Sequence, residues 1–87
     1  MSYDVASVRS HFPALREGAA HFDGPGGTQT PEMVANAVRE TLLSAVANRG
    51  VVTPAECRAE EIVAGCRAAE GDLLGCEPGG VIFGRSA

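Results

Sequence analysis

The chain has 87 residues, a net charge of −4 and a hydrophobic fraction of 45%, so it can form at most one small domain of globular composition. Its seven basic residues are scattered and all are Arg, which argues against binding to nucleic acid or to an anionic membrane. No apolar run approaches the roughly 20 residues that span a bilayer. Because the first residues lack the layout of a secretory signal, we expect a cytoplasmic protein.

The N-terminal residues predict a short helix over 4–12. Asp4 can cap it, and Val5, Val8 and Phe12 share one face at steps of three and four. Pro13 ends this helix, because proline disfavours helical backbone at the residue before it. Residues 20–22 are apolar apart from His21 and predict a very short extended segment.

A glycine-rich stretch, DGPGGTQTP, follows at residues 23–31. Three glycines and two prolines exclude regular structure, so we expect a loop. Consecutive glycine N–H groups can bind an anion. The favoured alternative is a tight turn in which Asp23 bonds to the backbone two residues on. His21 is likewise favoured as a packed or surface residue over a catalytic one.

The first long helix is expected over 31–47. Thr30 is a suitable N-cap and Pro31 a suitable first helical residue. An apolar stripe follows at helical spacing, formed by Met33, Val34, Ala37, Val38, Leu42, Ala45 and Val46. Gly50 is expected to end the helix as a left-handed cap. For Arg49 the favoured role is a partner of the helix dipole, and the minority interpretation is a ligand for a substrate carboxylate.

The second long helix is expected over 54–74. Thr53 and Glu56 form a capping box, with proline at the first helical position. Gly71 interrupts the helix at a cost of about 1 kcal/mol relative to alanine, and Gly75 marks its end.

The apolar run 81–83 follows a turn and predicts a strand buried on both faces. Residues 84–87, Gly-Arg-Ser-Ala, come directly after it. A small-residue turn after a buried strand is where phosphate groups bind when a helix begins there. The predicted fold class is therefore mostly α, with three helices and one or two short strands.

The three cysteines indicate little chemistry. Cys57, Cys66 and Cys76 are separated by nine and ten residues, and both histidines are distant in sequence. Structural zinc needs four ligands at closer spacing, so we expect no metal site. Reduced thiols are the favoured interpretation.

The order of these motifs resembles the N-terminal part of class V aminotransferase enzymes of fold type I, and within them the cysteine desulfurase-like branch. The resemblance covers essentially the whole chain. It rests on FDGPGGTQTP at 22–31, NRG at 48–50, DLLG at 72–75 and EPGGVIFGRSA at 77–87.

The resemblance implies a longer enzyme that uses pyridoxal 5′-phosphate, has an α/β large domain and acts as a homodimer on a small amino acid. Residues 1–30 would be the N-terminal helix and substrate-entrance loop, and 31–87 would lead to the first strand of the large domain. Arg85, Ser86 and Ala87 would bind the cofactor phosphate. Gly26, Gly27, Thr28 and Arg49 would contact substrate.

The catalytic residues of that family lie outside this chain, which has no lysine for the Schiff base. We therefore assign no catalytic residue here. Three interpretations stay open: a fragment of such an enzyme, one subunit of a split enzyme completed by a lysine-bearing partner chain, or a non-enzymatic helical binding module.

Overall fold

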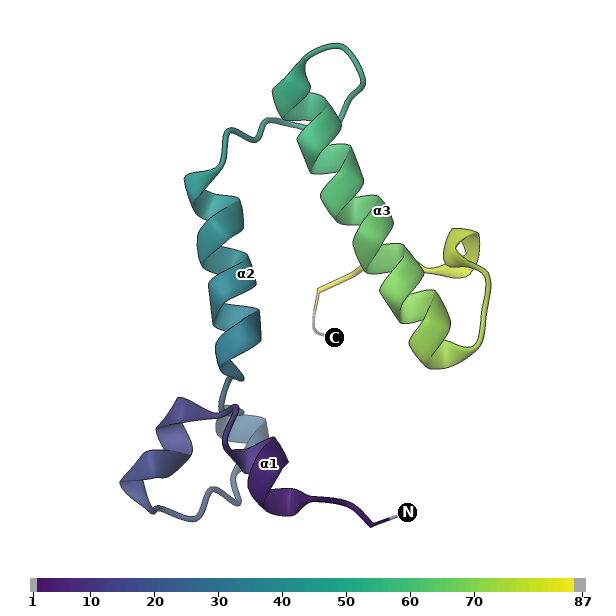
Figure 1. Ribbon diagram of the computed structural model, residues 1–87. Coiled ribbons are helices and arrows are strands. Elements are labelled where there is room, and N and C mark those ends of the chain that lie inside the picture. Colours follow the sequence, from purple (N-terminus) through teal and green to yellow (C-terminus); the bar gives the residue numbers. More distant parts are fainter. Residues whose placement is uncertain (1, 86–87) are drawn as a thin grey trace. The chain divides into compact units, whose positions relative to one another are not determined.

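The computed structural model describes residues 2–85 and is mostly helical, as the sequence predicts. Its α-helices are α1 (Val5–Arg9), α2 (Glu32–Leu43) and α3 (Pro54–Leu74), and the described residues contain no strand (Figure 1). Short 3₁₀ turns are η1 (Pro13–Glu17), η2 (Gly24–Gly26) and η3 (Pro78–Gly80). No helix in the described part of the chain is long and apolar enough to cross a membrane.

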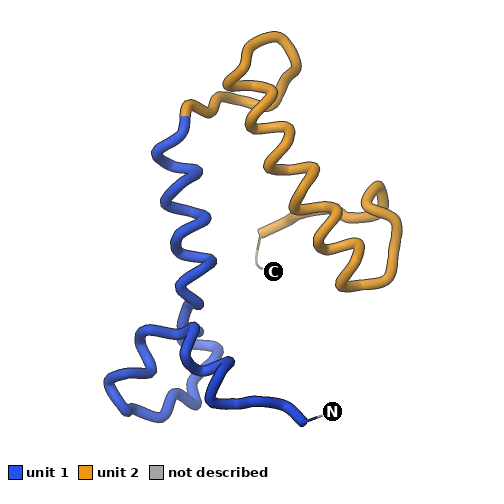
Figure 2. Tube along the Cα trace, in the orientation of Figure 1, with its two compact units in different colours: residues 1–44 blue, residues 45–87 orange. Residues whose placement is uncertain are grey.

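The chain divides into two compact units, residues 1–44 and residues 45–87 (Figure 2). The first contains α1, η1, η2 and α2, and the second contains α3 and η3. The predicted boundary between residues 30 and 31 separates parts by their expected function and not by compactness. That division stays a prediction.

Helix α1 is shorter than expected. Asp4 caps it as predicted, since its Oδ1 accepts a hydrogen bond from the Ser7 N–H at 3.0 Å. The helix nevertheless ends at Arg9, and Phe12 is extended at φ −113° and ψ 92°. The 3₁₀ segment η1 then occupies part of the expected connection, because Pro13 presets helical φ after the break.

Helix α2 also differs from the prediction at both ends. Pro31, not Thr30, stands at the N-cap position, and the helix begins at Glu32. It ends at Leu43 because Ser44 turns to extended backbone, with its hydroxyl donating to the Thr41 carbonyl oxygen at 2.8 Å. Serine competes in this way with continued helix.

Gly50 is consequently not a helix cap, and its φ is not positive. Glycine suits this position for another reason: a β-carbon here would collide with the Glu56 carboxylate.

Helix α3 confirms the prediction for 54–74. The Glu56 N–H donates to Thr53 Oγ1 at 3.2 Å, and Glu56 Oε2 accepts from the N–H groups of Val52 and Thr53, which completes the capping box. Gly75 ends the helix in the left-handed region at φ 70°. Its N–H and that of Cys76 both donate to the Gly71 carbonyl oxygen.

Neither predicted strand is formed in the described residues. Residues 20–22 and 81–83 have no neighbouring strand in residues 2–85 to accept and donate ladder hydrogen bonds, and an isolated strand is not stable. Val81 alone of the second segment is buried, at 8% exposure, whereas Ile82 is 89% exposed. The prediction that this segment is buried on both faces is therefore wrong for the described residues.

The apolar stripes of the long helices remain largely uncovered within their own units. On α2 the large side chains Met33, Val34, Val38, Leu42 and Leu43 are all exposed. Among the described residues, Val81 is the one large apolar side chain that is buried, at 8% exposure. Each unit is thus held mainly by local hydrogen bonds and glycine turns, with little apolar core.

Candidate functional site

The glycine-rich loop folds as a tight turn built on Asp23. The Gly26 N–H donates to Asp23 Oδ1 at 3.2 Å and to the Asp23 carbonyl oxygen at 3.1 Å, and the Gly27 N–H donates to the Gly24 carbonyl oxygen. Because these N–H groups are engaged within the turn, the favoured interpretation of Asp23 as a turn former is supported. An anion site on the same two N–H groups is not.

Glycine is favoured at two positions of this turn, for two different reasons. A β-carbon on Gly26 would collide with the Asp23 carboxylate, and Gly27 has a φ of 151°, which side chains rarely adopt. The turn directs the chain from the short helices toward Thr28 and Gln29.

A pocket of about 240 Å³ lies in the first unit, between α1, η1 and this loop. Its lining residues are Val8, Arg9, Phe12, Leu15, His21, Gly24, Gly27, Thr28 and Gln29. Val8, Phe12 and Leu15 give it an apolar side, and Arg9, Thr28 and Gln29 give it hydrogen-bond donors. Such a combination suits a small molecule with one polar end.

This pocket brings together two of the residues that the resemblance predicts to contact substrate. Gly27 and Thr28 line it, whereas Gly26 does not. Sequence reasoning missed Arg9 and Gln29 as lining residues. The spacing of Val8 and Phe12 predicts an apolar face, but no local signal indicates that Arg9 or Gln29 lies beside it. Gln29 Nε2 lies 3.5 Å from His21 Nδ1, the long limit of a hydrogen bond.

Arg49 belongs to the second unit and is already paired. Its Nε and Nη2 donate to the two carboxylate oxygens of Glu60, each at 3.0 Å, so the pair is bidentate. This hydrogen bond raises the pKa of Arg49 and holds the pKa of Glu60 below its ordinary value. The role of helix-dipole partner for Arg49 is wrong, because α2 ends at Leu43.

The predicted phosphate ligands are described only in part. Arg85 is exposed and follows irregular backbone, while Ser86 and Ala87 lie outside the described residues. The described residues do not form a complete pyridoxal phosphate site, since Arg85 is one donor without a surrounding cradle and the sequence contains no lysine. We derive no chemical step through that cofactor.

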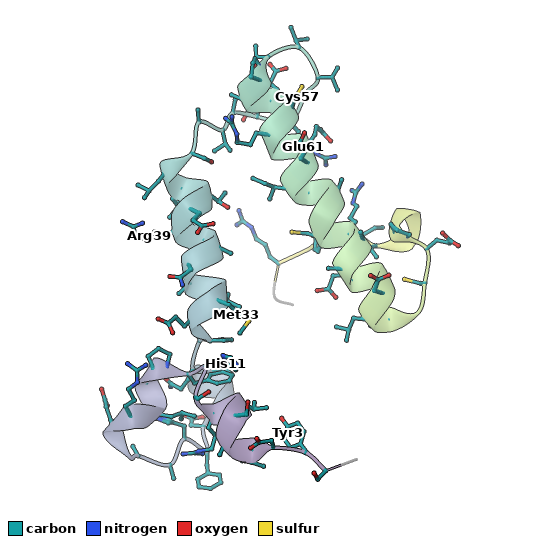
Figure 3. The ribbon with its side chains drawn as sticks, viewed as in Figure 1. Tyr3, His11, Met33, Arg39, Cys57 and Glu61 are labelled. Atoms are coloured by element: carbon teal, nitrogen blue, oxygen red, sulfur yellow. The ribbon has the colours of Figure 1, made fainter. Side chains whose placement is uncertain are left out.

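The cysteines are separate free thiols. Cys57 lies in the first turn of α3 (Figure 3) and is half-buried, whereas Cys66 and Cys76 are exposed. No cluster of three or more potential metal ligands occurs among residues 2–85.

One known protein is similar to this chain in sequence. The chain is 37% identical over 84 residues to the uncharacterized protein MT3887 of Mycobacterium tuberculosis (strain CDC 1551 / Oshkosh). The match includes 97% of this chain but only 21% of the relative, so the chain spans about a fifth of the length of that protein. No protein-family model matches the chain. No solved structure matches it either.

Proposed function

We propose that this chain forms the N-terminal part of a longer enzyme of the cysteine desulfurase-like, class V aminotransferase type, which uses pyridoxal phosphate and acts on a small amino acid. We expect the chain alone not to catalyse this reaction, because it has no lysine amine to form the Schiff base. The α/β large domain, the cytoplasmic location and the homodimer are parts of the same proposal.

The exposed apolar surface is the observation that supports a longer protein, whereas the type of enzyme is taken from the resemblance of the sequence motifs. Met33, Val38 and Leu42 on α2 are 54–77% exposed within their unit, and Ile82 is 89% exposed. Burial of each large apolar side chain is worth about 1.5–3 kcal/mol. Surfaces of this kind normally contact further protein, and a relative roughly five times as long as the matched region supports such a continuation.

Residues 81–83 have a specific role in this proposal. Val81 is extended at φ −92° and ψ 127°, and the next two side chains are large and apolar. In a longer enzyme the segment becomes a strand once neighbouring strands pair with it. Gly27 and Thr28 would then contribute the first-unit pocket to the substrate entrance, and Arg85 would add one positive charge near the cofactor phosphate.

The test compares this chain with the M. tuberculosis relative. We expect the purified relative to bind pyridoxal phosphate and to yield, after borohydride reduction, an adduct on a lysine outside the 84 matched residues. A chimera in which this chain replaces those residues should keep the adduct. The 87-residue chain alone should give none at an internal residue.

Other outcomes separate the competing interpretations. A relative without bound cofactor contradicts the proposal. If the isolated 87-residue chain unfolds sharply, with a concentration-independent midpoint above about 60 °C, it is a stand-alone binding module instead. If cofactor binding requires a separately encoded lysine-bearing chain that co-purifies with this one, the enzyme is split.

A further inference from the structure

A second pocket, of about 210 Å³, lies in the second unit and has a different chemical character. It is formed by α3, by the segment before α3 and by η3. Its lining residues are Arg49, Glu60, Ala64, Arg67, Pro78 and Gly79. Residues 60, 64 and 67 follow at helical spacing, so their side chains share one face of α3.

The charges in this pocket do not cancel. Glu60 is engaged by Arg49 through both carboxylate oxygens. Arg67 lines the same pocket, and its positive charge adds a minor contribution to the lowered pKa of the Glu60 carboxyl. Two guanidinium groups and one carboxylate therefore line the pocket, which leaves one positive charge in excess.

Arg67 carries the unused hydrogen-bonding capacity. Its Nε is shielded from solvent and has no hydrogen-bond partner in the described part of the chain. A buried donor without a partner is costly, and native proteins leave few of them. The planar guanidinium fork matches a carboxylate through two parallel N–H donors.

The wall opposite α3 leaves space for a ligand. Gly79 has no heavy atom within 4 Å of the position where a β-carbon would stand, so the space beside it is open. Ala64 on α3 is also small. No large side chain fills the space between Arg67 and η3 among the lining residues.

We propose that this pocket binds the carboxylate group of a small molecule through Arg67, while Glu60 holds Arg49 beside it. The single excess positive charge matches the single negative charge of a carboxylate. This site is distinct from the first-unit pocket, and it does not depend on the function proposed above.

The experiment follows the Arg67 Nε–H resonance of the ¹⁵N-labelled 87-residue chain during a titration with sodium acetate at constant ionic strength. We expect a saturable shift of this resonance. Sodium phosphate is titrated in parallel, and equal or tighter binding of phosphate would show that the pocket selects negative charge and not a carboxylate.

Variants decide whether the fork or only the charge matters. Arg67→Lys keeps the charge but loses the fork, and it should weaken acetate binding about tenfold, as the loss of a charge-assisted hydrogen bond predicts; backbone amide shifts report binding in this variant. The Glu60 carboxylate competes with the ligand carboxylate for the two guanidinium groups, so Glu60→Gln should strengthen binding. Arg39→Gln, in the other unit, is the matched control and should change nothing.

Three further results would overturn the proposal. These are a shift that does not saturate, Arg67→Lys binding acetate as well as the natural chain, and Arg39→Gln weakening binding as much as Arg67→Lys. If Arg67→Lys does not fold, Glu60→Gln decides alone, because unchanged or weaker binding by that variant contradicts the proposed competition.

Discussion

Gly71 and Cys76 approach each other so closely that a β-carbon on Gly71 would lie 2.9 Å from the Cys76 carbonyl oxygen. The Cys76 N–H in turn donates to the Gly71 carbonyl oxygen at 2.9 Å. Gly71 is also buried. Gly71 has a low helix propensity, but it permits the chain to fold back along α3 toward η3.

Gly71→Ala should therefore destabilise the second unit despite the higher helix propensity of alanine. Gly65→Ala is the matched control, because Gly65 lies in the same helix with nothing within 4 Å of its β-carbon position. That control should raise the free energy of unfolding by about 0.5–1 kcal/mol. Urea denaturation followed by circular dichroism measures both, and stabilisation by both variants would contradict the close approach.

Removal of the α3 cap should also lower stability. Thr53→Ala removes the side-chain acceptor of the Glu56 N–H, and the expected loss in the free energy of unfolding is about 1 kcal/mol. Glu56→Gln keeps an oxygen that can accept from the N–H groups of Val52 and Thr53, so its loss should be smaller. Denaturation of both variants tests this order, and a larger loss for Glu56→Gln would contradict it.

The Arg49–Glu60 pair predicts a pH dependence. The pKa of Glu60 lies below its ordinary value of 4.5 in the folded chain, chiefly because Arg49 donates to it. The folded state therefore binds fewer protons than the unfolded state near that pH. The contribution to stability is present above about pH 4.5 and is lost as the pH falls through the folded pKa.

Arg49→Gln should raise the pKa of the Glu60 carboxyl, as followed by ¹³C NMR. Arg39→Gln, with the same loss of charge elsewhere, is the control. Titration of Glu60 at the same pH in the natural chain and in Arg49→Gln would show that the pair does not set its pKa.

The uncovered face of α2 should make the isolated chain self-associate. Leu42 is 77% exposed, and its replacement in Leu42→Gln removes part of the apolar stripe. We expect less association in sedimentation velocity, whereas the conservative Asn36→Gln on the same helix should behave like the natural chain. A natural chain that is monomeric at every concentration would contradict this expectation.

The predictable part of the fold depended on local signals. Thr53, Glu56 and Gly75 specify both ends of α3 through contacts within a few residues, and the sequence shows them directly. The end of α2 was not predictable in this way. Its apolar spacing continues to Val46, but Ser44 satisfies the last carbonyl groups and ends the helix earlier.

The site was less predictable because contacts across the sequence determine it. Gly27 and Thr28 line a pocket as expected, yet Arg9 and Leu15 reach that pocket only through the bend between α1 and η1. The pairing of Arg49 with Glu60 spans 11 residues and has no local motif. Residues 81–83 have strand character that only neighbouring strands could realise.

The backbone also joins both sides of the glycine-rich loop. The Glu32 N–H, at the start of α2, donates to the His11 carbonyl oxygen at 2.7 Å. A helix as short as α1 is marginal by itself in water. The Glu32–His11 hydrogen bond, called the clasp below, connects the residues that follow α1 to the longer helix α2. The Glu32 amide should consequently exchange its hydrogen slowly only while the clasp is closed, and its exchange rate becomes a measure of how often the first unit opens.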